Sequence, residues 1–169
     1  PTPSGDRNSP LLPDFLPGSL SIQSGDARDY DGLAAFHYRA RRPATWARVF
    51  CIHWQPQPAR QRPARRLVAI GVLSWPTAVS TPRRQVFQLP GDYAEQLAFA
   101  NAHVRTISRV IVHPQFRGLG LARILIQRLC DDCPTRFVEA TASMGVAHPM
   151  FERAGMHRLD RPDGLPAYF

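Results

Sequence analysis

The order of apolar and polar residues predicts strands in several parts of the chain. Residues 19–23 alternate between the two types, as a half-buried strand does. Apolar residues dominate three later runs, 67–75, 106–112 and 136–140. We expect each run to be a strand, and we expect residues 157–169 to add final strands around a turn at 161–164.

Helical patterns lie between these strands. Residues 24–30 carry polar groups that suit a helix start, and the helix that follows has one apolar side, made of Tyr30, Leu33, Ala34 and Phe36. A short helix is expected over 93–102. Another begins after Gly120, with apolar residues at Leu121, Ile124, Leu125 and Leu129. A last short helix is expected over 143–156, with Gly155 at its C-terminal cap.

The other segments are loops or fit two structures. Residues 45–54 fit either a helix or a strand, and 77–91 resembles a loop. Residues 55–66, rich in proline and arginine, are expected to form an exposed loop. Residues 1–18 contain five prolines and predict an extended arm or linker. We therefore expect one folded domain over 19–169.

Length and hydropathy bound the class of protein. The chain has 169 residues, of which 44% are hydrophobic, which suits one domain with a sizeable core. It has no uninterrupted apolar stretch of the roughly 18–20 residues that cross a bilayer. No basic region followed by an apolar run marks a signal peptide at the start. We expect a cytoplasmic protein that does not contact membranes.

A glycine-rich turn between the strand 106–112 and the next helix is the strongest candidate for a binding site. Its sequence, from residue 113 to residue 120, is His-Pro-Gln-Phe-Arg-Gly-Leu-Gly. The first turn of a helix has unpaired N–H groups and the positive end of the helix dipole, so it attracts phosphate. Glycine lets a ligand approach the backbone closely. The turn therefore predicts an anion site.

The spacing of these glycines excludes two nucleotide motifs. A dinucleotide fingerprint would need glycine at position 123, which is Arg123. A P-loop would need a lysine, and the chain contains none. The spacing fits Q/R-x-x-G-x-G/A, with Gln115, Gly118 and Gly120 at the defined positions.

This motif resembles the pyrophosphate-binding turn of the GNAT superfamily, the acyl-CoA-dependent N-acyltransferases. Residues 147–156, Ala-His-Pro-Met-Phe-Glu-Arg-Ala-Gly-Met, resemble the short helix that follows later in that superfamily. The resemblance implies an α+β fold in which a mixed, twisted sheet is flanked by helices and splits between two parallel strands. Acetyl-CoA or a related acyl-CoA would enter the split.

A narrower similarity involves residues 36–39, 108–114 and 149–156. Together they look like the acetyltransferase domain found fused to ABC-type ATPases. This similarity implies that an ATPase domain of the same longer chain is a possible partner.

The resemblance also assigns cofactor-binding residues. The backbone N–H groups of the turn would hold the pyrophosphate, and the edge of the preceding strand would pair with the pantetheine amides. One N–H of that strand would polarise the thioester carbonyl. The residues concerned are Val110, Ile111, Val112, Gln115, Arg117, Gly118, Leu119, Gly120 and Ala122.

The catalytic groups are less clearly indicated. Direct attack by an amine needs a neutral amine and a proton source for the leaving thiolate. The usual acid of the superfamily is a tyrosine on the short helix, where this chain has Phe151. Tyr38, His148 or a water could replace it, and a weakly basic thiolate needs no dedicated acid.

Three residues are candidates for the base, namely Glu139, His37 and His103. Glu139 lies in an apolar strand, and a position on the solvent side is an equally good interpretation. His37 clusters with Tyr38 and Arg39, which favours a role at the acceptor amine. Ser108 is expected either to hydrogen-bond the acceptor or simply to lie on a strand.

The net charge of the chain does not identify the acceptor of the acetyl group. All 21 basic residues are arginine, and the formal net charge is +8. Arginine binds oxyanions bidentately, although a GC-rich genome also explains the absence of lysine. The loop with Arg60, Arg62, Arg65 and Arg66 would suit nucleic acid, or it is a solvated surface. The acceptor amine could therefore belong to a small molecule, a protein or a nucleic acid, and a CoA-binding regulatory domain without turnover is a further alternative.

Three cysteines do not form a disulfide framework of the secreted type. Cys130 and Cys133 are a single C-x-x-C pair, and with Cys51 and His53 they could supply four zinc ligands. Because no second pair exists, we expect buried thiols rather than a metal site.

Overall fold

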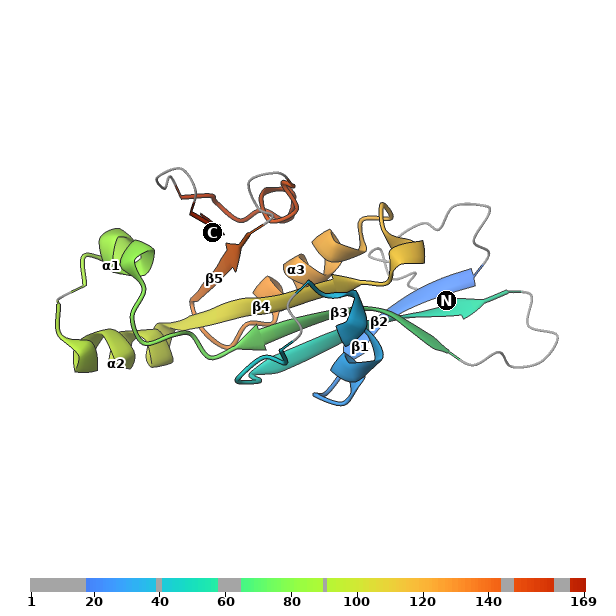
Figure 1. Cartoon of the computed structure of the whole chain (residues 1–169), viewed down its shortest axis with the longest axis horizontal. Helices are drawn as coiled ribbons and strands as arrows, with labels where there is room; N and C mark the ends of the chain where they lie inside the picture. Colours follow the sequence, from blue (N-terminus) through green and yellow to red (C-terminus); the bar gives the residue numbers. More distant parts are fainter. Residues whose placement is uncertain (1–17, 39–40, 58–64, 90, 144–147, 160–164) are drawn as a thin grey trace, which may run out of the picture.

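A six-stranded sheet forms the centre of the computed structural model, which describes residues 18–38, 41–57, 65–89, 91–143, 148–159 and 165–169 (Figure 1). The strands lie in the sheet in their order along the chain. Their bounds are β1 (Gly18–Ser24), β2 (Arg48–Pro56), β3 (Arg66–Ser74), β4 (Val104–Val112), β5 (Phe137–Ala142) and β6 (Ala167–Tyr168). All neighbours pair antiparallel except β4 and β5, which are parallel. The sheet is thus mixed and flanked by helices, and the expected α+β fold class is confirmed.

In the residues that the structure describes, three α-helices and four short 3-10 turns accompany the sheet. The α-helices are α1 (Thr81–Phe87), α2 (Tyr93–His103) and α3 (Leu121–Asp131). The 3-10 turns are η1 (Asp29–Gly32), η2 (Ala34–Phe36), η3 (Pro114–Phe116) and η4 (Glu152–Ala154). In Figure 1, α1 and α2 lie together at one end of the sheet, whereas α3 lies alongside the central strands. No helix among the described residues has both the length and the apolar character needed to cross a bilayer.

The two faces of the sheet bury separate apolar clusters. On one face, α3 contributes Leu121, Leu125, Ile126 and Leu129 to the larger cluster. Gly71 of β3 lies beneath this helix, and a Cβ there would come within 2.9 Å of a Leu129 methyl group. On the other face, Tyr30 and Leu33 cover Ile70 and Ile111. Burial of apolar side chains on both faces stabilises the central strands and fixes their register.

Several expected elements differ from those observed. The segment 45–54 is resolved in favour of a strand, because most of it lies in β2. The helix expected after residue 24 is wrong, since the segment holds only η1 and η2. There the Asp26 carboxylate accepts from the N–H of Arg28, and Asp29 accepts from the N–H of Asp26. These local bonds compete with helical ones.

The expectation of a loop over 77–91 was also wrong, because α1 lies within it. Ser80 caps this helix by accepting from the N–H of Arg83 at 3.4 Å, and proline occupies its first turn. Both are ordinary helix-start signals.

The helix expected over 143–156 is reduced to η4 among the described residues. Residues 144–147 lie outside the described part of the chain. Pro149 disfavours helical geometry at His148. Gly155 ends the turn as predicted, in the left-handed region with φ 95°. Of the arm expected over 1–18, residues 1–17 lie outside the described residues and Gly18 begins β1; the turn at 161–164 also lies outside them.

Candidate functional site

The parallel strands β4 and β5 separate partway along β4. They pair only where residues 104–107 face 137–140. Beyond this point β4 stays paired with β3 as far as Val112, while Thr141 and Ala142 of β5 pair with β6. Within the described part of the chain, the side of β4 that faces β5 therefore leaves residues 108–112 without a neighbouring strand. Such an edge offers backbone groups to an extended ligand.

A β-bulge at Ser108 accompanies the separation. In the pairing of β3 with β4, Val72 faces Arg109 while Leu73 faces Ile107, so Ser108 is the extra residue. Its hydroxyl oxygen lies 2.7 Å from that of Ser74. Bulges bend a strand and increase its twist, and this one lies just beyond the last β4–β5 pair, Ile107 with Ala140. The Ser108 side chain thus has a position within the sheet, next to the start of the open edge.

The open edge leads directly into the glycine turn. Phe116 of η3 is buried and anchors this turn to the core. Gly118 and Gly120 have φ of 84° and 76°, in the region that favours glycine. A Cβ at either position would meet no atom within 4 Å, so open space lies beside both.

Helix α3 begins immediately after this turn. Gly120 is its N-cap residue, and no side chain caps the helix. Its first N–H groups and the positive end of its dipole therefore remain available to an anion. The predicted cradle has the open space and the uncapped helix start that a pyrophosphate needs.

Arginine side chains make the surroundings of the turn electropositive. Arg117 is exposed, and its Nε donates to the carbonyl of Val112 at 3.3 Å. The pKa of His113 is lowered by partial burial and by the guanidinium groups of Arg66 and Arg117. His113 is therefore neutral at pH 7, and the positive charge here belongs to arginine. Gln115 is exposed, whereas Leu119 and the side chains of Val110 and Val112 pack against the larger cluster.

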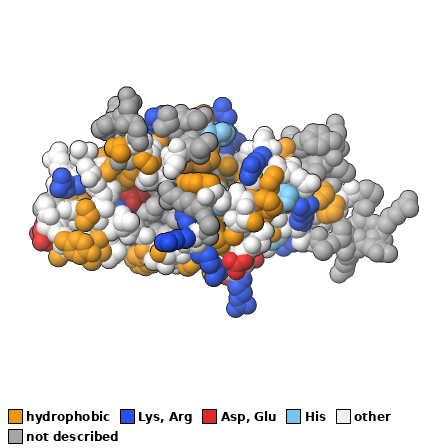
Figure 2. All heavy atoms as spheres, viewed as in Figure 1, with side chains coloured by type: hydrophobic (Ala, Val, Ile, Leu, Met, Phe, Trp, Pro, Cys, Tyr) orange, Lys and Arg blue, Asp and Glu red, His pale blue; other side chains and the backbone are white. Residues whose placement is uncertain are grey.

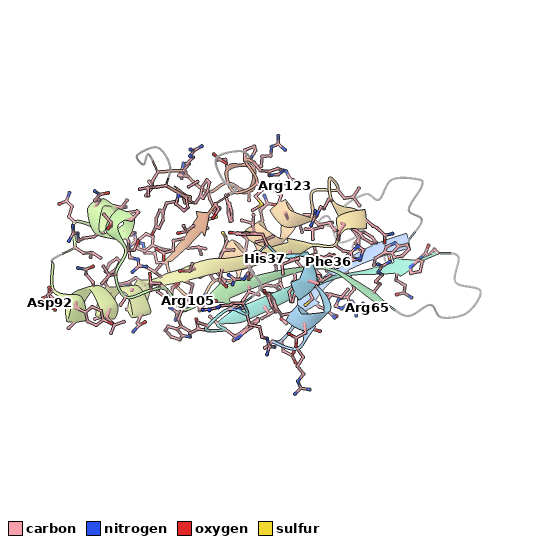
Figure 3. All side chains as sticks on the ribbon, viewed as in Figure 1. Phe36, His37, Arg65, Asp92, Arg105 and Arg123 are labelled. Atoms are coloured by element: carbon pink, nitrogen blue, oxygen red, sulfur yellow. The ribbon has the colours of Figure 1, made fainter. Side chains whose placement is uncertain are left out.

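His37 and Tyr38 lie together just after η2. Their ring centroids are 4.6 Å apart. The Tyr38 hydroxyl donates to the Ser143 hydroxyl at 3.5 Å, which brings this segment to the end of β5. Arg109 of β4 donates to the carbonyl of Arg41 at 2.9 Å. These two hydrogen bonds thus hold Tyr38 and Arg41 beside the separated strands. Figure 3 shows Phe36 and His37 over the central strands.

Glu139 was expected to be either a catalytic base or a residue on the solvent side. It is instead buried, and both of its carboxylate oxygens accept hydrogen bonds from neighbouring side chains. Only 8% of the residue is exposed. One carboxylate oxygen accepts from Arg83 at 2.7 Å and from Thr106 at 2.8 Å. The other accepts from Arg83 at 3.0 Å and from the hydroxyl of Tyr168. An external amine could use this carboxylate only after a buried ion pair had broken. No local pattern around Glu139 points to Arg83 and Tyr168, which lie 56 and 29 residues away in the chain.

The other candidates for acid and base occupy peripheral or core positions. Phe151, at the position of the usual tyrosine, is buried and stacks on Phe169 with centroids 4.9 Å apart. His103 ends α2 and contacts the ring of Phe99. His148 is exposed.

The four residues considered as zinc ligands lie in different parts of the structure. Cys51 belongs to the cluster beneath η1, whereas Cys130 and Cys133 pack against the cluster beneath α3. His53 contacts Gln23 through its ring nitrogen at 3.3 Å. Among the described residues, no group of three or more His, Cys, Asp or Glu side chains could hold a metal ion. The zinc alternative is therefore not supported.

Cys51 is expected to be chemically inert in the folded chain. Burial, with Asp29 nearby, raises its pKa to about 12, and its side chain has no exposed surface. Because the thiolate is the reactive form, iodoacetamide at pH 8 should leave Cys51 unmodified while Cys133 reacts. Peptide mass spectrometry would show this, with the urea-unfolded chain, alkylated at all three cysteines, as the control. Equal rates at Cys51 and Cys133 in the folded chain would contradict the placement of Cys51.

Comparisons with known proteins agree with this geometry. Residues 85–156 match the family model described as Acetyltransferase (GNAT) family, and this range contains β4, the glycine turn, α3 and η4. A crystal structure of a KacT mutant is similar, with a TM-score of 0.52 and 16% identity, over 89% of this chain and 94% of that one. The KacTA–DNA complex gives 0.50 and 14%, over 89% and 92%.

A third solved structure is similar at a lower level. It is an agmatine N-acetyltransferase mutant in its apo form, with a TM-score of 0.48 and 13% identity, over 88% and 96% of the two chains. A search of curated proteins gave no match. At these identities, the likeness to KacT concerns the fold.

Proposed function

We propose that the protein is an acetyltransferase of the GNAT family, whose model residues 85–156 match, and that it transfers an acetyl group from acetyl-CoA to an amine by direct attack. The observation that carries this proposal is the continuity of two features. The unpaired edge of β4 leads without interruption into a turn whose two glycines have positive φ at the start of α3. An extended ligand with a pyrophosphate at one end would use both.

The backbone supplies most of the proposed cofactor contacts. The N–H groups of Arg117, Gly118, Leu119, Gly120 and Ala122 would hold the pyrophosphate. The edge at Val110, Ile111 and Val112 would pair with the pantetheine amides, and one of its N–H groups would polarise the carbonyl. Acetyl-CoA supplies the acetyl group as an activated thioester. The open space beside Gly118 and Gly120, together with the uncapped helix start, fits this group.

His37 is the base that we propose for the acceptor amine, either directly or through a water. It lies next to Tyr38, whose hydroxyl reaches the end of β5 and could protonate the departing thiolate. Ser108 would orient the acceptor at the start of the open edge. We do not assign the base to Glu139, because its four hydrogen bonds leave the carboxylate already engaged.

Removal of the His37 imidazole should slow transfer without weakening cofactor binding. We expect His37→Gln to lower kcat about 100-fold, as is usual for loss of a general base. Chromatographic detection of CoA from acetyl-CoA would measure this, with small amines, peptides and nucleic acids as candidate acceptors. His157→Gln, at an exposed histidine, is the matched control. Unchanged kcat in His37→Gln would remove His37 from the mechanism, and no CoA formation with any acceptor would favour a regulatory domain that only binds acetyl-CoA.

A nucleic-acid acceptor or partner is the second candidate, favoured by the net charge of +8. Exposed arginines include Arg41, Arg42, Arg48, Arg65 and Arg66, and Figure 2 shows several basic groups spread over one face. Arg60 and Arg62 of the predicted basic loop lie outside the described residues. Gel shifts on DNA and tRNA should weaken steeply as salt rises if phosphates are bound. Undetectable or salt-independent shifts would exclude this candidate.

The cytoplasmic location and the ATPase partner also remain predictions. They rest on the sequence patterns and on the narrower resemblance of residues 36–39, 108–114 and 149–156. Detection of the protein as part of one longer polypeptide with an ATPase domain would support the second of them.

A further inference from the structure

The Glu139 carboxylate connects four elements that are far apart in the sequence. It accepts hydrogen bonds from Arg83 of α1, Thr106 of β4 and Tyr168 of β6, and Glu139 itself lies on β5. Arg83 also donates to the carbonyl groups of Thr77 and Ala78, at 2.9 and 3.3 Å. The Glu139 carboxylate and the Arg83 guanidinium, both buried, thus form an ion pair at the junction of these four elements.

This junction lies where β4 and β5 are about to separate. Thr106 faces Glu139 in the parallel pairing, and the next pair, Ile107 with Ala140, is the last. On the other side of β5, the backbone N–H and carbonyl of Ala140 bond with Phe169, both at 2.9 Å. β5 is thus held between β4 and the C-terminal residues at the level where the open edge of β4 begins.

The hydrogen bonds to Glu139 are buried, so their stability depends strongly on their geometry. Only 2% of Arg83 is exposed. Burial and the adjacent Glu139 raise the pKa of Tyr168, so its hydroxyl stays a donor at neutral pH. Ionised groups that are buried need good geometry and satisfied partners. Such a network has few alternative arrangements, and it can define the angle at which two strands part.

We propose that Arg83, Thr106, Glu139 and Tyr168 form a positioning network that sets the separation of β4 from β5 and thereby the affinity for acetyl-CoA. This inference rests on the proposed function, because it concerns the same open edge. It assigns Glu139 a role through Thr106 and Tyr168 rather than on the acceptor amine. It also assigns roles to α1 and β6, which supply Arg83 and Tyr168.

Two single-atom changes would test the proposal without removing the buried ion pair. Tyr168→Phe removes one donor to Glu139, and Thr106→Val removes another. We expect each variant to bind acetyl-CoA about fivefold more weakly in calorimetry, well below its melting temperature, since each loses one buried hydrogen bond. Thr106→Ser keeps the hydroxyl and should bind like the wild type. Tyr93→Phe, at a tyrosine that is 60% exposed, is the matched aromatic control.

The outcomes separate this proposal from the proposed function. If the wild type binds acetyl-CoA and both Tyr168→Phe and Thr106→Val bind it equally well, the positioning role is overturned, even if their melting temperatures fall. That result would leave a network that only stabilises the fold, or a Glu139 that acts as the base. If the wild type does not bind acetyl-CoA, the proposed function and the positioning role both fail. If one of the two variants fails to fold, the acetyl-CoA affinity of the other still tests the positioning role.

Discussion

Gly120→Glu is expected to weaken acetyl-CoA binding at least about 100-fold, through lost space and like-charge repulsion at the start of α3. The added side chain would enter the open space beside the glycine, where the pyrophosphate is proposed to lie. A carboxylate there would also occupy the helix N-terminus in place of the phosphates. Calorimetric titration with acetyl-CoA would measure the loss.

The control for this variant is the same substitution at Gly155, a second glycine with positive φ. Gly155 has φ 95°, and a Cβ there would also meet no atom within 4 Å. Gly155→Glu therefore carries a similar conformational cost, on the order of 1–2 kcal/mol, at the end of η4 rather than in the glycine turn. We expect both variants to lose similar stability, whereas only Gly120→Glu should lose binding. Equal affinities would show that the turn does not hold the cofactor.

Glu139→Ala is expected to lower the free energy of unfolding by about 3–5 kcal/mol. The substitution leaves the Arg83 guanidinium buried without its counterion, and it leaves the hydroxyl groups of Thr106 and Tyr168 without their acceptor. Domains of this size are stable by only about 5–15 kcal/mol, so the loss would be a large fraction. Urea unfolding would measure it, with Glu95→Gln on the exposed surface of α2 as the control.

A double variant tests whether the uncompensated charge causes this loss. Replacing both ionised groups, as Arg83→Met with Glu139→Leu, removes the charge as well as its counterion. Apolar replacement of a whole buried ion pair is often close to neutral for stability. We expect the double variant to recover at least about half of the stability lost in Glu139→Ala. A double variant as unstable as Glu139→Ala would mean that packing, rather than charge, explains the loss.

The local structure around the proposed cofactor site could be predicted because its signals are local. The strand 104–112, the glycine spacing and the apolar side of α3 are contiguous in the chain. Each follows from nearby residues, namely β-branched side chains, positive φ at glycine and helical periodicity. The structure places Gly118 and Gly120 in the left-handed region, which glycine adopts at little cost.

The surroundings of the other candidate residues could not be predicted in the same way, because long-range contacts define them. Glu139 was equally consistent with catalysis and with solvent exposure, and only the approach of Arg83 across 56 residues places it in a buried ion pair. Tyr38 reaches Ser143 across 105 residues. Hydrophobic periodicity carries no information about such pairs. The helix over 81–87 was also missed, although Ser80 and Pro82 are local signals of a helix start.

A crystal structure with CoA would test the central claim most directly. We predict that pyrophosphate oxygens lie about 3 Å from backbone nitrogens between Gly118 and Ala122, as hydrogen bonds require. We also predict that the pantetheine lies along the edge of β4 from Val110 to Val112, between β4 and β5. CoA bound at another surface, with the glycine turn and the open edge of β4 free of it, would contradict the proposal.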